Sequence, residues 1–330
     1  MRTLVLILLI VFACQPQKET LHIRTVSGEI QPNDMGISLI HEHVLVDFIG
    51  ADSTGYHRWN RADVIVRVMP FLEAAKARGV KTIVECTPAY LGRVPLLLKE
   101  LSEKSGIQFL TNTGYYGAVG GKYLPKIVET ATSEELAAIW IGEAKDGIEN
   151  TGIKPGFIKI SVNEGSTLNA LDEKLVRAAA LTHQATGLLI VSHTGPWATA
   201  KAQIEILQSM SVDLGQFVWV HAQNEKDFAS YDIAHDLGVW ISLDGIAWDV
   251  PGHLERLNYF RKKGLLDRVL VSHDAGWYSP GETNGGDFKG YTALFDELIP
   301  QLRSAGFEDA DIDLLLVQNP RTAFSVIHKK

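Results

Sequence analysis

Short apolar runs without polar alternation recur along the chain and are separated by stretches with helical periodicity. Runs rich in Val, Ile, Leu and Phe are typical of strands that are buried on both faces. They predict strands over residues 36–40, 80–84, 107–110, 157–160, 188–191, 217–220, 239–243 and 268–271. Helical patterns cover residues 64–78, 172–185, 228–237 and 254–263, each closed by a nearby glycine, and residues 132–135 have the spacing of a capping box.

This alternation predicts the fold class. Eight strand-then-helix units in one chain of 330 residues favour a single (β/α)8 barrel of the α/β class over an open doubly wound sheet. The contents of 46% hydrophobic and 21% charged residues are typical of a globular protein with a large core. No G-x-G-x-x-G or G-K-S/T motif is present, so we expect no cradle for nucleotide phosphates.

Charge and cysteine content argue against nucleic-acid-binding proteins and against proteins built on disulfides or cysteine-bound zinc. The net charge is −8, and no run rich in Lys and Arg occurs, which argues against a nucleic-acid partner. The 2 cysteines provide neither a disulfide framework nor a C-x-x-C zinc site.

The first residues differ from the rest of the chain. The apolar run over residues 4–13 is too short to span a bilayer but is typical of a signal peptide. It ends in Val11–Phe12–Ala13–Cys14, which resembles a bacterial lipobox. We therefore expect a signal peptide (1–13), a polar tether (14–21) beginning at a lipidated Cys14, and the barrel (22–330). An ordinary signal peptide with a chance cysteine is the alternative. Both export the protein to the periplasm or cell envelope, and membrane contact is expected only through the lipid anchor.

Side chains that can bind metal follow several predicted strands. In His41–Glu42–His43, the two-residue period of a strand puts both imidazoles on one face and Glu42 on the other. Four further groups lie on or after later strands: Lys159, His193, His221 and Asp274. In a barrel, the ends of these strands meet at the catalytic rim. Nitrogen and oxygen ligands without thiolate suit zinc, manganese, cobalt or iron, with zinc as the default.

Lys159 stands between apolar strand residues, where a cation is costly to bury. One interpretation is a lysine whose stem is buried while its amine reaches water; the other is a functional lysine.

Taken in order, these motifs resemble the amidohydrolase superfamily and, more narrowly, its phosphotriesterase family. The resemblance spans about residues 22–328 and rests on His41–Glu42–His43 together with residues 113–116, 156–159, 191–195, 221–224, 272–274 and 318–320. It implies a hydrolase with a binuclear metal centre at the C-terminal face of the barrel.

The resemblance also implies a role for each residue. His41, His43 and Asp274 would hold one divalent ion, and His193 and His221 the other. Lys159, carboxylated by CO2, would bridge both ions as a carbamate. A hydroxide between the ions would attack an ester, lactone, amide or phosphoester bond, with Asp274 as general acid and base. Asp244 matches a family aspartate that lies near the site and would support the ligands from outside.

Substrate choice depends on the loops. Tyr116 stands where lactonase-like members have tyrosine, and Trp248 and Trp277 are candidates for the pocket wall. Gly245 and Asn224 depart from the family pattern, because triesterases carry proton-relay groups there. We expect residues 275–282 to form a short polar loop, and the substrate to be a small or polar ester, lactone or N-acyl amide, with weak, promiscuous organophosphate hydrolysis.

Two other functions were weighed. One is a lipid-anchored barrel that serves as a non-catalytic small-molecule binding protein, and the complete ligand set argues against it. The other is a mononuclear, deaminase-like barrel, and Lys159 argues against it. The loop tryptophans would also permit a homodimer.

Overall fold

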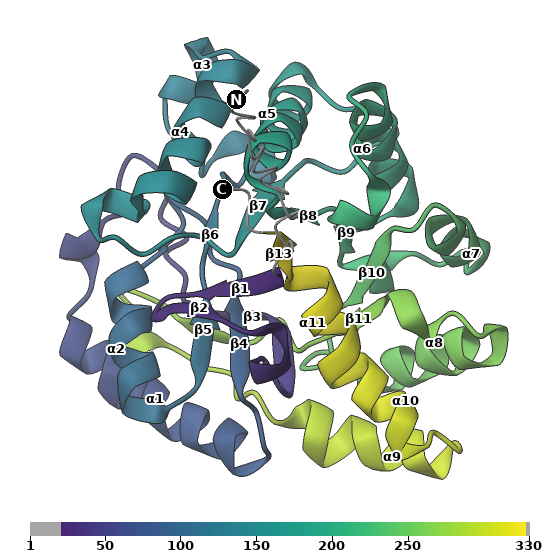
Figure 1. Ribbon diagram of the computed structural model, residues 1–330. Coiled ribbons are helices and arrows are strands. Elements are labelled where there is room, and N and C mark those ends of the chain that lie inside the picture. The colour runs from purple at the N-terminus through teal and green to yellow at the C-terminus, as the bar shows by residue number, and fades with distance from the viewer. Residues whose placement is uncertain (1–20, 328–330) are drawn as a thin grey trace, which may run out of the picture.

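Parallel strands of the computed structural model, which describes residues 21–327, close into a barrel surrounded by helices (Figure 1). One run of neighbours is β3-β4-β5, and the other is β6-β7-β8-β9-β10-β11. β5 and β6 are one strand interrupted at Thr111, and β12 closes the barrel by pairing in parallel with β3. The barrel strands are β3 (Ser38–Leu45), β4 (Thr82–Glu85), β5 (Gln108–Leu110), β6 (Asn112–Thr113), β7 (Phe157–Ser161), β8 (Leu189–His193), β9 (Phe217–Val220), β10 (Trp240–Leu243), β11 (Val269–Val271) and β12 (Gly276–Tyr278). The predicted (β/α)8 fold is confirmed, and each predicted strand overlaps an observed one.

The helices form the outer ring in Figure 1. Their bounds are α1 (Arg61–Ala77), α2 (Pro95–Ser105), α3 (Ile127–Thr130), α4 (Ser133–Asp146), α5 (Ala170–Thr186), α6 (Trp197–Ser209), α7 (Ala229–Asp236), α8 (Val250–Lys263), α9 (Ile299–Ser304), α10 (Asp309–Asp313) and α11 (Asn319–Phe324). The predicted capping box opens α4, where Thr132 and Glu135 bond each other's backbone N–H groups. Within residues 21–327, no helix combines the length and the apolar character needed to cross a membrane.

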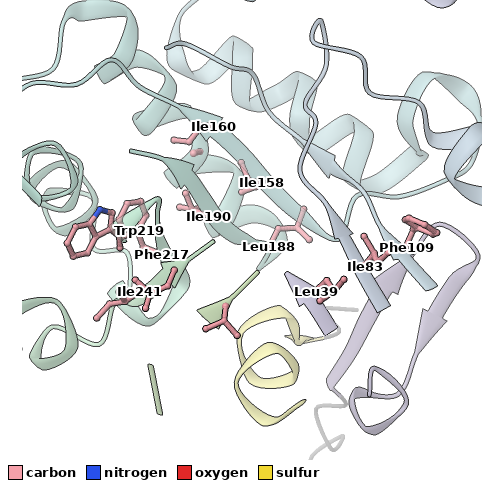
Figure 2. Packing of buried hydrophobic residues seen from close by; sticks show 14 of the residues in the cluster. Leu39, Ile83, Phe109, Ile158, Ile160, Leu188, Ile190, Phe217, Trp219 and Ile241 are labelled. Carbon is pink, nitrogen blue, oxygen red and sulfur yellow. The ribbon is translucent and has the colours of Figure 1, made fainter. Parts of the chain in front are cut away.

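Alternation along the strands divides the core into two layers. Ile158, Ile160 and Ile190 belong to the cluster between strands and helices (Figure 2). Phe157 and Leu189 belong instead to a second buried cluster, which fills the barrel interior. The same period points Lys159 and His193 into the barrel, above the apolar residues of the strand beginnings.

A small antiparallel sheet closes the N-terminal end of the barrel. It consists of β1 (Leu21–Thr25), β2 (Gly28–Ile30) and β13 (Val326–Ile327), in the order β13-β1-β2. Ile23 and Phe324 add their side chains to the inner cluster. This small sheet was not predicted from the sequence. Leu21, counted there with the tether, is the first residue of β1, whereas the predicted signal peptide, Cys14 and the rest of the tether lie outside the described residues.

Two irregularities shape the rim of the barrel. The register between β3 and β4 shifts between Leu39 and Glu42, so that Ile40 joins the inner cluster while His41 also faces the interior. The prediction of a short polar loop over residues 275–282 was wrong, because β12 lies within it. Gly276 permits this pairing: it has φ 105°, and an added Cβ would lie 1.7 Å from the backbone oxygen of His43.

Gly114, directly after β6, allows the backbone of β7 to approach closely. Its φ is 115°, and an added Cβ would lie 2.1 Å from the backbone oxygen of Lys159. We expect Gly114→Ala to destabilise the chain by about 3 kcal/mol, since β7 would have to move. Gly142→Ala in α4 is the matched control, because an added Cβ meets nothing within 4 Å; it should stabilise the chain by roughly 0.5–1 kcal/mol. Denaturant unfolding measures both, and equal stability of the two variants would contradict the argument.

Candidate metal centre

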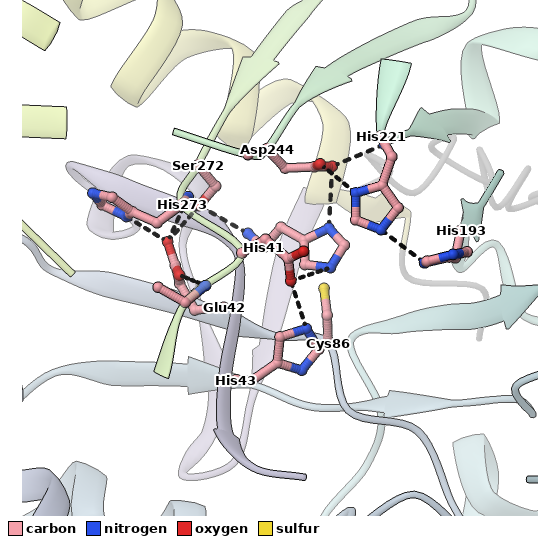
Figure 3. A network of polar contacts seen from close by, with 12 residues as sticks. His41, Glu42, His43, Cys86, His193, His221, Asp244, Ser272 and His273 are labelled. Carbon is pink, nitrogen blue, oxygen red and sulfur yellow. Dashed lines mark hydrogen bonds and ion pairs between the residues drawn. The ribbon is translucent and has the colours of Figure 1, made fainter. Parts of the chain in front are cut away.

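Six side chains converge on one cavity at the C-terminal end of the barrel. They come from β3, β7, β8 and the segments that follow β9 and β11, and the cavity volume is about 60 Å³. The structure thus brings together all of the ligands expected from the sequence, which are His41, His43, Lys159, His193, His221 and Asp274. Figure 3 shows the imidazoles of this group facing one another.

The five candidate ligands other than Lys159 form two sets. Candidate ligand atoms of His41, His43 and Asp274 all lie within 4.8 Å of one another. His43 Nε2 is 3.1 Å from Asp274 Oδ1. His221 Nε2 and His193 Nδ1 form the second set and are 2.7 Å apart. These are the two sets that the family resemblance assigns to two ions, and their role as ligands stays a prediction.

In three of the imidazoles, the Nδ1 atom is within hydrogen-bond distance of a buried side chain. Asp244 contacts His41 Nδ1 at 3.2 Å and His221 Nδ1 at 2.6 Å. Thr87 Oγ1 contacts His43 Nδ1 at 2.8 Å and donates to Glu85 Oε1 at 2.6 Å. With each Nδ1 engaged, the Nε2 atoms are left for the cavity, an arrangement typical of metal-binding histidines.

Glu85 and Thr87 were not predicted from the sequence as supporting residues. Their position at the end of a predicted strand was the available signal.

The electrostatics favour the protonation states that a cation needs. Burial, followed by the charge of Lys159, lowers the pKa of His41 to about 4. Burial also holds the pKa of His193 well below its ordinary value. Although burial opposes ionisation of Asp274, its hydrogen bond to His43 and the charges of His41 and His221 keep its pKa below the usual range. Near neutral pH His41 and His193 are therefore neutral and Asp274 is ionised. Burial lowers the pKa of His221, but the charge and the hydrogen bond of Asp244 outweigh this effect and raise it.

Lys159 decides whether this donor set fits a metal centre. Its side chain is 1% exposed, and its Nζ has no hydrogen-bond partner among the described residues. The snorkelling interpretation is therefore wrong, because the amine does not reach water. A buried polar group without a partner is costly, and a buried charge more so. Conversion to an anionic ligand would remove this cost, so the residues present fit a pair of divalent cations.

Two of the six residues have strained backbones. His221 has φ 58° and Asp274 has φ 53°, both in the left-handed region that favours glycine. Such conformations cost on the order of 1–3 kcal/mol each and persist where the surrounding structure enforces them, often at functional sites. The strain turns each side chain into the cavity directly after a strand ends.

Comparison with known proteins agrees with this geometry. The model of the phosphotriesterase family matches residues 21–324. The chain belongs to the phosphotriesterase family. Members of this family use a binuclear divalent metal centre, and the protein is accordingly a metal-dependent hydrolase. This finding favours the hydrolase over the non-catalytic binding protein.

Individual relatives extend over nearly the whole chain. The phosphotriesterase homology protein of Escherichia coli K12 is 33% identical over 88% of this chain and 98% of its own length. The aryldialkylphosphatase of Saccharolobus solfataricus is 28% identical over 90% of this chain and 97% of its own length. The solved structure of the organophosphorus hydrolase from Deinococcus radiodurans has a TM-score of 0.84 at 26% identity and covers 95% of this chain and 99% of that chain.

Glu42, as predicted, is not among the residues that line the cavity, and neither is His273, which precedes Asp274. Glu42 Oε1 accepts hydrogen bonds from Ser272 Oγ at 2.7 Å and from His273 N at 3.0 Å, and contacts His273 Nδ1 at 2.7 Å. Glu42 Oε2 accepts from Ala275 N at 3.0 Å. These contacts join β3 to the segment after β11 (Figure 3) and so hold the backbone on both sides of Asp274.

The three predicted pocket residues lie at different depths. Tyr116 lines the cavity, with its hydroxyl 3.2 Å from His193 Nε2, and burial raises the pKa of this phenol, so it stays a neutral donor. Trp277 also lines the cavity, 5.5 Å from His43 between ring centroids. Trp248 is not among the lining residues. It is 57% exposed and packs on Trp277 at the rim, where its Nε1 donates to the backbone oxygen of Asp274.

Proposed function

We propose that this member of the family hydrolyses a small carboxyl ester, lactone or N-acyl amide, using two divalent ions, with zinc as the default. The observation that carries the proposal is the buried amine of Lys159, which has no hydrogen-bond partner within residues 21–327 and lines the same cavity as four imidazoles and a carboxylate. The residues that would hold the ions are His41, His43, His193, His221, Asp274 and Lys159, the last as its carbamate.

The bound ions would supply a water of lowered pKa and polarise the C=O or P=O group of the substrate. Asp274 faces the cavity as a carboxylate and would take up the proton of the attacking water and pass it to the leaving group. The hydroxyl of Tyr116 is placed to donate to a substrate oxygen beside His193. Asp244 keeps both Nδ1 atoms that it contacts engaged, which preserves the tautomers needed for this chemistry.

The cavity favours a small substrate. Its volume is about 60 Å³. Apolar side chains form much of its wall, among them Val46, Pro88 and Leu91. A short acyl group fits this space better than a triester with three bulky arms. The names of the Saccharolobus and Deinococcus relatives support organophosphate hydrolysis as a second activity.

The test begins with elemental analysis of protein purified without chelator, followed by assays with small esters, lactones, N-acyl amides and organophosphates. We expect about two ions per chain and turnover that is lost with chelator and regained with zinc and bicarbonate. A metal-loaded protein that turns over none of these classes would contradict the proposed activity.

We propose further that Cys14 anchors the protein in the cell envelope, on the strength of the lipobox-like residues 11–14. Cys14→Ser should release the protein from the membrane fraction, whereas Cys86→Ser, at a buried cysteine inside the barrel, should leave it bound. Equal release of parent and Cys14→Ser would count against the anchor. The homodimer stays a prediction.

A further inference from the structure

A single carboxylate serves both predicted metal subsites. Asp244, at the end of β10, is fully buried, and its two oxygens point to different imidazoles (Figure 3). Oδ1 contacts His221 Nδ1 at 2.6 Å, and Oδ2 contacts His41 Nδ1 at 3.2 Å. Burial opposes ionisation of this group, but the charges and hydrogen bonds of His221 and His41 hold the pKa of Asp244 well below its usual range.

Each oxygen of Asp244 also has a side-chain donor of its own. Gln223 Nε2 donates to Oδ1 at 3.0 Å, and Ser242 Oγ donates to Oδ2 at 2.7 Å. The other end of the Gln223 amide accepts a hydrogen bond from the backbone N–H of Asp244 at 3.2 Å. Gln223 therefore holds Asp244 at two points, so that the carboxylate can satisfy both imidazoles at once.

The position of Gln223 depends on Gly245. A Cβ added at Gly245 would lie 2.8 Å from Gln223 Nε2 and 3.4 Å from its Cδ. Any side chain at this position would push the amide away from Asp244. The departure from the family pattern at Gly245 thus has a local consequence, because the amide occupies the space that a longer residue would need.

We infer that Gln223 and Ser242 are positioning residues that tune the two metal subsites separately. Gln223 acts through Oδ1, which contacts the imidazole of His221, on the subsite of His193 and His221. Ser242 acts through Oδ2 mainly on the subsite of His41, His43 and Asp274, because the imidazole that Oδ2 contacts is that of His41, while the backbone N–H of His221 also donates to Oδ2 at 3.2 Å. The inference rests on the two-ion centre proposed above. Loss of an outer partner of this kind typically reduces metal affinity by roughly 10- to 100-fold.

Titration of the metal-free full chain with zinc in bicarbonate buffer, against a competing chelator, tests this. The parent should bind in two resolved steps, and His193→Ala identifies the step of its own subsite by abolishing it. Gln223→Ala should weaken that step by about 10- to 100-fold and leave the other nearly unchanged. Ser242→Ala should show the opposite pattern.

Gly245→Ala gives a second route to the same result, since it displaces Gln223 without altering it. It should reproduce the pattern of Gln223→Ala. Gln208→Ala and Ser53→Ala, at exposed positions, are matched controls that should change neither step. Equal weakening of both steps by Gln223→Ala and Ser242→Ala, or no change in either, would overturn the inference while leaving the two-ion centre intact. A parent that binds fewer than two ions would overturn the proposed function as well.

Discussion

Replacement of Lys159 by methionine is expected to remove most of the bound metal and to lower kcat/KM by about a thousandfold, equivalent to about 4 kcal/mol. The reason is that the buried amine, once carboxylated, would be the only one of the six candidate side chains shared by both ions. Methionine has a similar length and carries no charge, so the strand should keep its packing. Elemental analysis and steady-state kinetics on the same preparations measure both effects.

Although Lys159→Met should impair metal binding and activity, we expect it to stabilise the metal-free chain. Because Lys159 Nζ is buried and has no partner in the described part of the chain, its removal should raise the free energy of unfolding by roughly 1–3 kcal/mol. Lys154→Met, at an exposed position before β7, is the matched control and should change neither metal content nor stability. A Lys159→Met protein that retains two ions and full activity would show that the lysine is no ligand.

Asp274→Asn is expected to lower kcat by about 10²- to 10⁴-fold, and zinc in excess should not restore it. The variant keeps the shape of the side chain but loses its negative charge and its ability to take up a proton. It should also weaken binding of the ion near His43, whose Nε2 lies 3.1 Å from Asp274 Oδ1. Kinetics at rising zinc concentrations separate the two effects, because only the binding defect responds to added metal.

Asp287→Asn serves as the control, since Asp287 is exposed in the segment that follows β12. If excess zinc returned Asp274→Asn to the parental kcat, Asp274 would be a ligand without a role in proton transfer.

The strands were predictable because burial on both faces leaves a local signature of continuous apolar residues. Their ends were less predictable. The first run was expected to stop at residue 40, yet β3 continues to Leu45 through the polar His41–Glu42–His43. Pairing with β4 and β12 keeps this segment extended, and neither partner is visible in the local pattern. The short β1, β2 and β13 escaped prediction for the same reason, since β13 pairs across the length of the described chain.

The six candidate ligands could be named from the sequence because each follows or lies on a strand, and all strands of a barrel end at one rim. The side chains that orient these ligands could not be named from the sequence. Glu85, Thr87, Gln223 and Ser242 act through contacts whose partners are chosen only when the barrel closes.

By itself, the sequence determined the fold class and the set of residues at the rim, because the apolar runs and the polar residues that follow them are local properties. The tertiary structure decided which atoms meet. His41 and Asp244 are separated by 203 positions and yet lie 3.2 Å apart, and His273 reaches Glu42 across 231 positions. Such contacts exist because closure of the sheet brings the first strand beside the last, and no local pattern of side chains encodes that distance.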